Sequence, residues 1–113
     1  MTETISMNVR SVDDAGIIDI TGDLTAASDA ALSDAYTQAS DIADVVVLNF
    51  AGLEYMNSSG IGLLVTLLIR ANRQKKRLAI GGLSEHYRNI FQITRLDDAI
   101  VIYATEDEAV AAA

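Results

Sequence analysis

The sequence predicts an α/β fold in which about four helices cover a mixed sheet of about five strands. From residue 26 onward, short apolar segments alternate with segments of helical spacing, and strands separated in this way pair in parallel through right-handed crossovers. Before residue 26, two strand-like segments flank a turn and predict an antiparallel hairpin. The chain has 113 residues, no proline and no repeat or linker, so we expect residues 1–113 to form one domain.

The hairpin is predicted by the first part of the chain. Ile5, Met7 and Val9 alternate with polar residues, which is the period-2 pattern of a half-buried strand. Asp13–Gly16 predicts the turn, and Ile17–Ile20 predicts the returning strand.

The segment that begins at Ala26 predicts the first helix, because its alanines recur at helical spacing beside Leu32 and Tyr36. These alanines are Ala27, Ala31, Ala35 and Ala39. Their small side chains indicate a helix that packs closely against its neighbour.

The later elements alternate between strands and helices. Strands are predicted at Val45–Phe50, Leu78–Ile80 and Ile100–Tyr103. The first of these has the apolar pattern of a strand covered on both faces. One helix is predicted to begin at the polar motif after residue 56 and to end at about Gln74. A second begins after an N-cap at Ser84, and a third begins at a capping box formed by Thr105 and Glu108.

The charge of the chain argues against a nucleic-acid partner. The net charge is −8, from 16 acidic and 8 basic side chains, and a negative field repels phosphate backbones. Five of the basic side chains gather at the predicted C-terminal end of a helix, where cations complement the helix dipole: Arg70, Arg73, Lys75, Lys76 and Arg77. We therefore interpret this cluster as structural.

Composition also argues against metal sites and membrane insertion. The chain has no cysteine, and His86 is its only histidine, so we expect no metal and no cofactor. The apolar run Ile61–Ile69 is far shorter than the roughly 18 residues that a membrane helix needs. Met1–Thr4 lacks the basic and apolar regions of a signal peptide. We expect no membrane partner and a cytoplasmic location.

The motif MNSSGIG, residues 56–62, stands between a predicted buried strand and a predicted helix. One interpretation is structural: Asn57 or Ser58 caps the helix, and Gly60 and Gly62 allow close packing. The other is functional: a serine accepts a phosphate that the helix dipole and backbone N–H groups favour, and the glycines let a partner approach closely.

Enzymatic interpretations of this motif fit poorly. It lacks the Gly-Lys-Ser/Thr of a phosphate-binding loop, and it does not match the Gly-x-Ser-x-Gly of serine hydrolases. A serine nucleophile also needs a positioned base, and the sole histidine lies in a surface-like segment. We expect no enzymatic activity.

The segment VVVLNFAGLEYMNSSGIGLLVTLLIRANRQ resembles the central signature of bacterial anti-sigma factor antagonists, the STAS domain family. IIDITGDLTAASDAAL is similar to the second strand and first helix of that family, and LSEHYRNIFQITRLDDAIVIYATEDEAV to its C-terminal third. The resemblance covers nearly the whole chain, is most specific in its centre, and implies the STAS fold.

The resemblance implies a partner switch. Such a protein binds an ATP-dependent serine kinase that doubles as an anti-sigma factor, and thereby releases the sigma factor. The kinase phosphorylates the serine that corresponds to Ser58, which ends the interaction, and a PPM-type phosphatase restores it. The position of Ser59 is usually Ser or Thr in the family and stays unmodified. The remaining residues that the resemblance places at the partner surface are Asp23, Thr25, Asn57, Gly60 and Gly62, in a chain expected to be a monomer or weak dimer.

Two positions depart from the family pattern. Asn57 stands where the family commonly has Asp before the acceptor serine. Thr25 stands where a second acidic residue is frequent, although Asp23 keeps one carboxylate there. We therefore expect phosphoryl transfer to Ser58 to be slow.

Two other functions stay open. The chain can be a STAS interaction module that is not phosphorylated, in a stressosome-like or lipid-transport assembly, with residues 56–62 as contact surface only. It can also be the regulatory STAS tail of an anion transporter, in which case the sequence is a fragment of a longer chain.

Overall fold

The computed structural model describes residues 5–112 and has the predicted mixed sheet. Five strands lie in the order β1-β2-β3-β4-β5, with β1 antiparallel to β2 and all other neighbours parallel. Their bounds are β1 Ile5–Val12, β2 Ala15–Leu24, β3 Val45–Met56, β4 Arg77–Gly81 and β5 Val101–Tyr103. The segment Met1–Thr4, on which the signal-peptide argument rests, lies outside the described residues.

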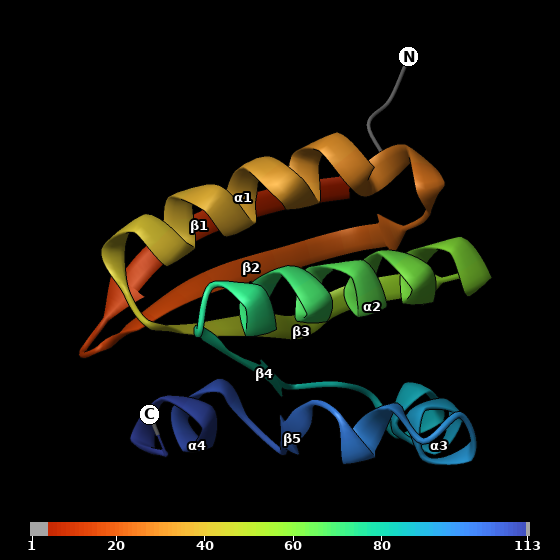
Figure 1. Cartoon of the computed structure of the whole chain (residues 1–113). Helices are drawn as coiled ribbons and strands as arrows, with labels where there is room; N and C mark the ends of the chain where they lie inside the picture. Colours follow the sequence, from red (N-terminus) through yellow and green to blue (C-terminus); the bar gives the residue numbers. More distant parts are fainter. Residues whose placement is uncertain (1–4, 113) are drawn as a thin grey trace.

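The helices cover the two faces of the sheet unequally (Figure 1). The α-helices are α1 Asp29–Ile42, α2 Ser58–Arg73, α3 Glu85–Ile93 and α4 Glu106–Ala111, and the 3-10 helices are η1 Ala26–Ser28 and η2 Leu96–Asp98. Helices α1, α2 and α3 contribute to the main core on one face, whereas α4 packs on the other. Within residues 5–112, no helix combines the length and apolarity that crossing a bilayer requires.

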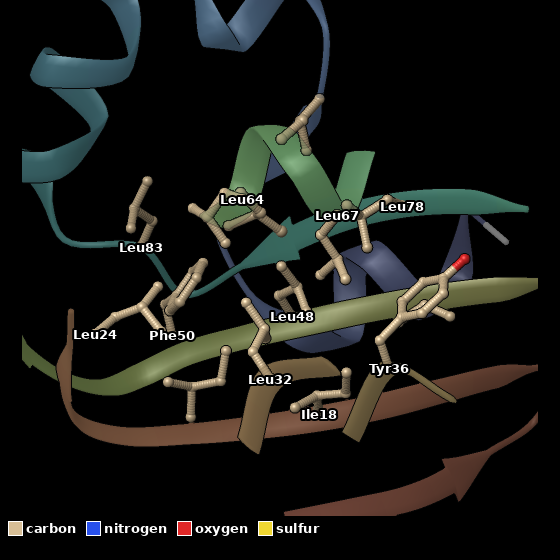
Figure 2. Close-up of a cluster of buried hydrophobic side chains, with 14 of the residues drawn as sticks. Ile18, Leu24, Leu32, Tyr36, Leu48, Phe50, Leu64, Leu67, Leu78 and Leu83 are labelled. Atoms are coloured by element: carbon tan, nitrogen blue, oxygen red, sulfur yellow. The ribbon is translucent and has the colours of Figure 1, made fainter. Parts of the chain in front are cut away.

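The main core lies between the central strands and helices α1 and α2. Figure 2 shows Ile18 and Leu48 from β2 and β3 facing Leu32 of α1 and Leu64 of α2. Ile17, next to Ile18 in β2, is fully buried on the opposite face, where it packs in a smaller cluster with residues of β3 and α4. The continuous apolar runs of β2 and β3 follow from burial on both faces.

The hairpin turn is shorter than the sequence predicts. Only Asp13 and Asp14 form it, while Ala15 and Gly16 already belong to β2 and are buried, so the predicted turn Asp13–Gly16 is wrong in its second half. The glycine has a packing role instead. A Cβ at Gly16 would lie 2.8 Å from the carbonyl oxygen of Ala39 in α1.

The first helix also differs in detail. The segment from Ala26 begins with the 3-10 turn η1, and α1 follows it. Ala35 and Ala39 are buried as the packing argument predicts, whereas Ala27 and Ala31 are exposed. The close approach to the sheet is therefore made by the second half of the alanine series.

The N-caps predicted at Ser84 and Thr105 are present, but of the capping box predicted for Thr105 and Glu108 the structure shows only the bond that Thr105 accepts. The side chain of Ser84 accepts a hydrogen bond from the backbone of Tyr87, and that of Thr105 accepts one from Glu108. Helix α2 ends at Arg73, with Arg70 and Arg73 in its last turn. The predicted end of this helix at about Gln74 is confirmed. The predicted gathering of the basic side chains at that helix end is also confirmed.

Candidate functional site

The site lies where β3 ends and α2 begins, and Asn57 is the residue between the two elements. Asn57 has an extended backbone with φ −98° and ψ −177°. Its side-chain oxygen accepts a hydrogen bond from the backbone N–H of Gly60 at 2.9 Å. Of the two candidate caps, the structure selects Asn57, which leaves Ser58 as the first helical residue.

Ser58 and Ser59 occupy the first two positions of α2, and both are exposed. The backbone N–H of Asn57 donates to the carbonyl of Leu24, that of Gly60 donates to the Asn57 side chain, and that of Ile61 begins the helical ladder at 3.0 Å. The amides of Ser58 and Ser59 thus remain at the positive end of the helix dipole. An anion on either hydroxyl would meet donors and a favourable potential.

The two glycines of the motif have different surroundings. Gly60 is buried, and a Cβ there would collide with the backbone carbonyl of Leu24 in β2. Gly62 is exposed, and a Cβ there would have no neighbour within 4 Å. Gly60 therefore provides close packing inside the chain, and of the two glycines only Gly62 lies at the surface.

A hydrogen bond from outside the motif supports this junction. The backbone N–H of Met56 donates to the hydroxyl of Tyr87 in α3 at 2.8 Å, in a buried setting. Met56 is 4% exposed and pairs with the fully buried Leu24 across the β2–β3 ladder. The backbone that leads into Ser58 is therefore held from β2 and from α3.

Asp23 and Thr25 lie on the β2 side of the same junction. Both are half-buried and flank Leu24, whose carbonyl contacts the start of α2. The Thr25 side chain accepts a hydrogen bond from the backbone N–H of Ala27 at 3.3 Å. The backbone N–H of Thr25 donates to the hydroxyl of the buried Ser28 at 3.1 Å. The structure thus brings residues 23–25 next to residues 57–60.

Sequence analysis missed one surface residue of this junction, Tyr55. It pairs with Asp23 in the β2–β3 ladder and is 50% exposed. The apolar pattern predicts a strand that ends at Phe50, whereas β3 continues to Met56, so the pattern gives no orientation for Tyr55. An aromatic residue directly before the motif MNSSGIG is the signal that could have identified it.

Among the described residues, no side chain forms a hydrogen bond that would activate Ser58 or Ser59 as a nucleophile. His86 is exposed in α3, and its ring contacts Tyr87 edge-on with centroids 4.8 Å apart. Within residues 5–112, no hydrogen bond links the Ser58 or Ser59 hydroxyl to another protein group, and no cluster of three or more metal-ligating side chains occurs.

A separate polar cluster lies on the sheet face that α4 covers. The guanidinium of Arg10 in β1 donates to both carboxylate oxygens of Asp19 in β2, at 2.6 and 2.9 Å, and to Glu106 of α4. Asn49 of β3 donates to Asp19 at 2.8 Å and to Glu106 at 3.3 Å. The hydrogen bonds from Arg10 lower the pKa of Asp19 to about 2. This cluster ties α4 to three strands.

Comparison with known proteins shows similarity to STAS proteins. An anti-sigma-B factor antagonist of Staphylococcus epidermidis is 43% identical over 53 residues, or 47% of this chain and 49% of that protein. The match therefore spans about half the length of such curated relatives. An anti-sigma factor antagonist from Mycobacterium paratuberculosis has a TM-score of 0.79 at 20% identity, covering 96% of this chain and 92% of that one.

The phosphorylated form of the Bacillus cell fate determinant SpoIIAA has a TM-score of 0.66 at 25% identity, covering 94% of this chain and 97% of that one. The family model described as "Mlab, STAS domain" matches residues 7–103, which is most of the chain. The match includes β2, β3, α2 and the whole junction around Ser58. This chain therefore belongs to the STAS domain family.

Proposed function

We propose that this chain is an anti-sigma factor antagonist whose binding to an anti-sigma factor kinase is switched off by phosphorylation of Ser58. The observation that carries the proposal is the position of Ser58: exposed, first in α2, and beside backbone amides that no helical carbonyl uses. The similarity to anti-sigma-B factor antagonists supports it.

The chemistry of a phosphate at this position supports a switch. Phosphoserine carries about −1.5 to −2 charges at neutral pH, and a helix N-terminus stabilises such an anion. Because Ser58 is exposed, the phosphate would stand in any interface that covers the start of α2. A bound partner would then face a desolvated dianion, so the modified protein dissociates.

The surface that binds the kinase contains the exposed part of the junction. Ser59 and Gly62 lie on α2, with Asn57 at its cap. Asp23 of β2, Thr25 at the cap of η1 and Tyr55 of β3 add a flank to this surface. Gly60 contributes indirectly, because its contact with Leu24 sets how close α2 lies to that flank.

The proposed cycle assigns this chain no catalytic role. The kinase supplies ATP and the transfer chemistry, and a PPM-type phosphatase removes the phosphate. Such a cycle would operate in the bacterial cytoplasm.

The test is phosphorylation by a histidine-kinase-like ATPase, chosen from the genes that neighbour this one. Incubation with that kinase and ATP should add one phosphate, measured by intact mass, and peptide mapping should locate it on Ser58. The Ser58→Ala variant should gain none. Modification of Ser59, or of Thr66 two turns further along α2, would contradict the assignment.

A second candidate is a STAS interaction module that is not phosphorylated, in a larger assembly such as a stressosome-like or lipid-transport complex. The description of the matching family model favours it, because that description names Mlab and not an antagonist. In that case the junction around Ser58 is contact surface only. Unchanged intact mass, together with stable capture of a partner that needs Tyr55 or Gly62, would select this function.

A further inference from the structure

Strand β1 is a long and regular edge of the sheet. Its eight residues pair with β2 in one continuous register without a bulge, whereas β5, at the opposite edge, has three residues. In an antiparallel edge strand, alternate residues direct their N–H and C=O groups away from the partner strand. β1 therefore presents a row of backbone donors and acceptors on its outer side.

A groove runs between this edge and α1. Its volume is about 430 Å³. It is lined by β1 residues Ile5–Val9 and by Ala31, Asp34, Ala35 and Gln38 of α1. Ile5, Met7 and Val9 are only half-buried in it, while Ile18 and Ile20 of β2, on the same face, are at most 1% exposed. The apolar face of the sheet is thus incompletely covered at this edge.

The features that usually protect an edge strand are absent from β1. It contains no proline or lysine, and its pairing has no bulge. Its one charged side chain, Arg10, is held over the sheet face by Asp19 and Glu106. No charge therefore guards the outer edge of the segment Ile5–Val9.

We propose that the groove binds an extended peptide segment of a partner protein, which adds to β1 as a sixth strand. Backbone hydrogen bonds to β1 supply affinity, and apolar side chains at alternate positions cover Met7, Val9 and Ala35. Five β1 residues span roughly 17 Å at about 3.4 Å each, which sets the length of the peptide.

The charge of the groove indicates which side chain the bound peptide carries. Asp34 is the one charged side chain among the residues that line the groove, so the segment carries a lysine or arginine opposite it. A second copy of this chain fits less well, because the cation of its own β1, Arg10, is engaged by Asp19 and Glu106. Two chains of net charge −8 also repel each other.

The site is independent of Ser58 phosphorylation. In Figure 1, α1 lies over β1 and β2 while α2 lies over β3, so α1 stands between the groove and the helix that carries Ser58. A protein of this kind can hold one partner at the start of α2 and a second at the β1 edge. The Ser58→Ala variant should accordingly bind groove peptides as wild type does.

The probe is a blocked eight-residue peptide in which valine alternates with threonine and one central valine is replaced by lysine, so that the lysine lies on the face that meets Asp34. Titration of the ¹⁵N-labelled full chain should shift the amide signals of Ile5–Val9 and of Ala31–Gln38. Slower amide exchange in β1 should accompany binding, since the peptide pairs with its outer edge. A peptide with a central proline should bind at least about tenfold more weakly, because it lacks a backbone donor and breaks the strand.

Matched variants locate the site. Ala31→Arg places a long side chain in the groove from an exposed position, and should weaken peptide binding by at least about tenfold. Ala30→Arg, exposed on the same helix but outside the groove, should leave binding unchanged. Asp34→Asn should weaken the lysine peptide about two- to fivefold and leave a glutamine version unaffected.

Three results would overturn the proposal. The first is a set of shifts confined to α2, α3 or β5. The second is peptide affinity that Ala31→Arg does not change while the variant melts as wild type. The third is a dimer in sedimentation velocity that Ala31→Arg dissociates, which would assign the groove to a second copy of this chain.

Discussion

The hydroxyl of Tyr87 accepts a hydrogen bond from the backbone N–H of Met56, and this bond links α3 to the junction that presents Ser58. The Tyr87→Phe variant keeps the ring but leaves a buried donor without a partner. We expect unfolding free energy to fall by about 1–3 kcal/mol. Urea denaturation measures it, and Tyr55→Phe, at a half-exposed position, is the control with a change below about 0.5 kcal/mol.

The two glycines of the motif should respond oppositely to alanine. Gly60→Ala forces a methyl group into the backbone of Leu24, which should cost about 1–3 kcal/mol or more through overpacking. Gly62→Ala adds a methyl group in open space and should stabilise α2 by up to about 1 kcal/mol. Thermal unfolding of both variants checks this. Equal effects would mean that α2 does not pack on Leu24 in solution.

Charge at Ser58 should control binding of the kinase. Ser58→Ala should bind it and resist release, and Ser58→Glu should bind more weakly, although one carboxylate imitates phosphate incompletely. Thr66→Glu adds the same charge to an exposed position about 12 Å along α2 and should have a smaller effect. Calorimetric titration measures all three. Equal affinities of wild type, Ser58→Glu and the phosphoprotein would refute the switch.

Asn57 should limit the rate of phosphoryl transfer. Asp at this position keeps the oxygen that caps Gly60 and adds a charge that can take a hydrogen bond from the Ser58 hydroxyl during transfer. We expect Asn57→Asp to raise the single-turnover rate by up to about 10²-fold, with kinase affinity roughly unchanged.

The control for this prediction is Asn57→Ala, which removes the cap and should cost about 1 kcal/mol of stability without accelerating transfer. An unchanged or lower rate for Asn57→Asp would leave Asn57 as a helix cap only.

Stability should depend on pH through Asp19. Its pKa is lowered to about 2 by the Arg10 hydrogen bonds, whereas an unfolded Asp titrates near 3.9. The ionised pair therefore stabilises the fold above about pH 4, and this contribution disappears as pH falls toward 2. Unfolding free energy should fall less steeply over this range in Asp19→Asn than in wild type. Asp14→Asn, in the exposed turn, should retain the wild-type slope.

The features of the fold that the sequence predicts correctly are those that depend on residues close together in the chain. Apolar period and capping side chains act within a few residues, so the strand and helix order and the caps at Ser84 and Thr105 were predictable. The extension of β3 beyond Phe50 depends on pairing of Gly52–Met56 with β2, across two register shifts. Such pairing is tertiary, and the polar residues in this segment gave no alternating pattern to predict it.

A glycine in the sequence says little about its structural role, because glycines occupy their positions for different reasons. Gly16 looked like a turn residue and is in fact a close contact with Ala39. Gly60 and Gly62 looked equivalent, yet only the first is buried. These differences depend on which backbone lies opposite, and a single sequence contains no record of that. The choice between Asn57 and Ser58 as the cap of α2 likewise depends on the orientation of the end of β3, which is set by tertiary pairing.

The packing of Gly60 on Leu24 has a consequence for the proposed phosphorylation of Ser58, because it fixes the start of α2 against β2. The junction has no room for a Cβ at Gly60 and is held by two strands and a helix, so the proposed phosphate would stand on a fixed support. A modification on such a support changes the surface potential and leaves the shape intact. In the proposed switch, the partner would therefore respond to the phosphate without a slow rearrangement between transfer and dissociation, and the proposed signal would last as long as the phosphoester.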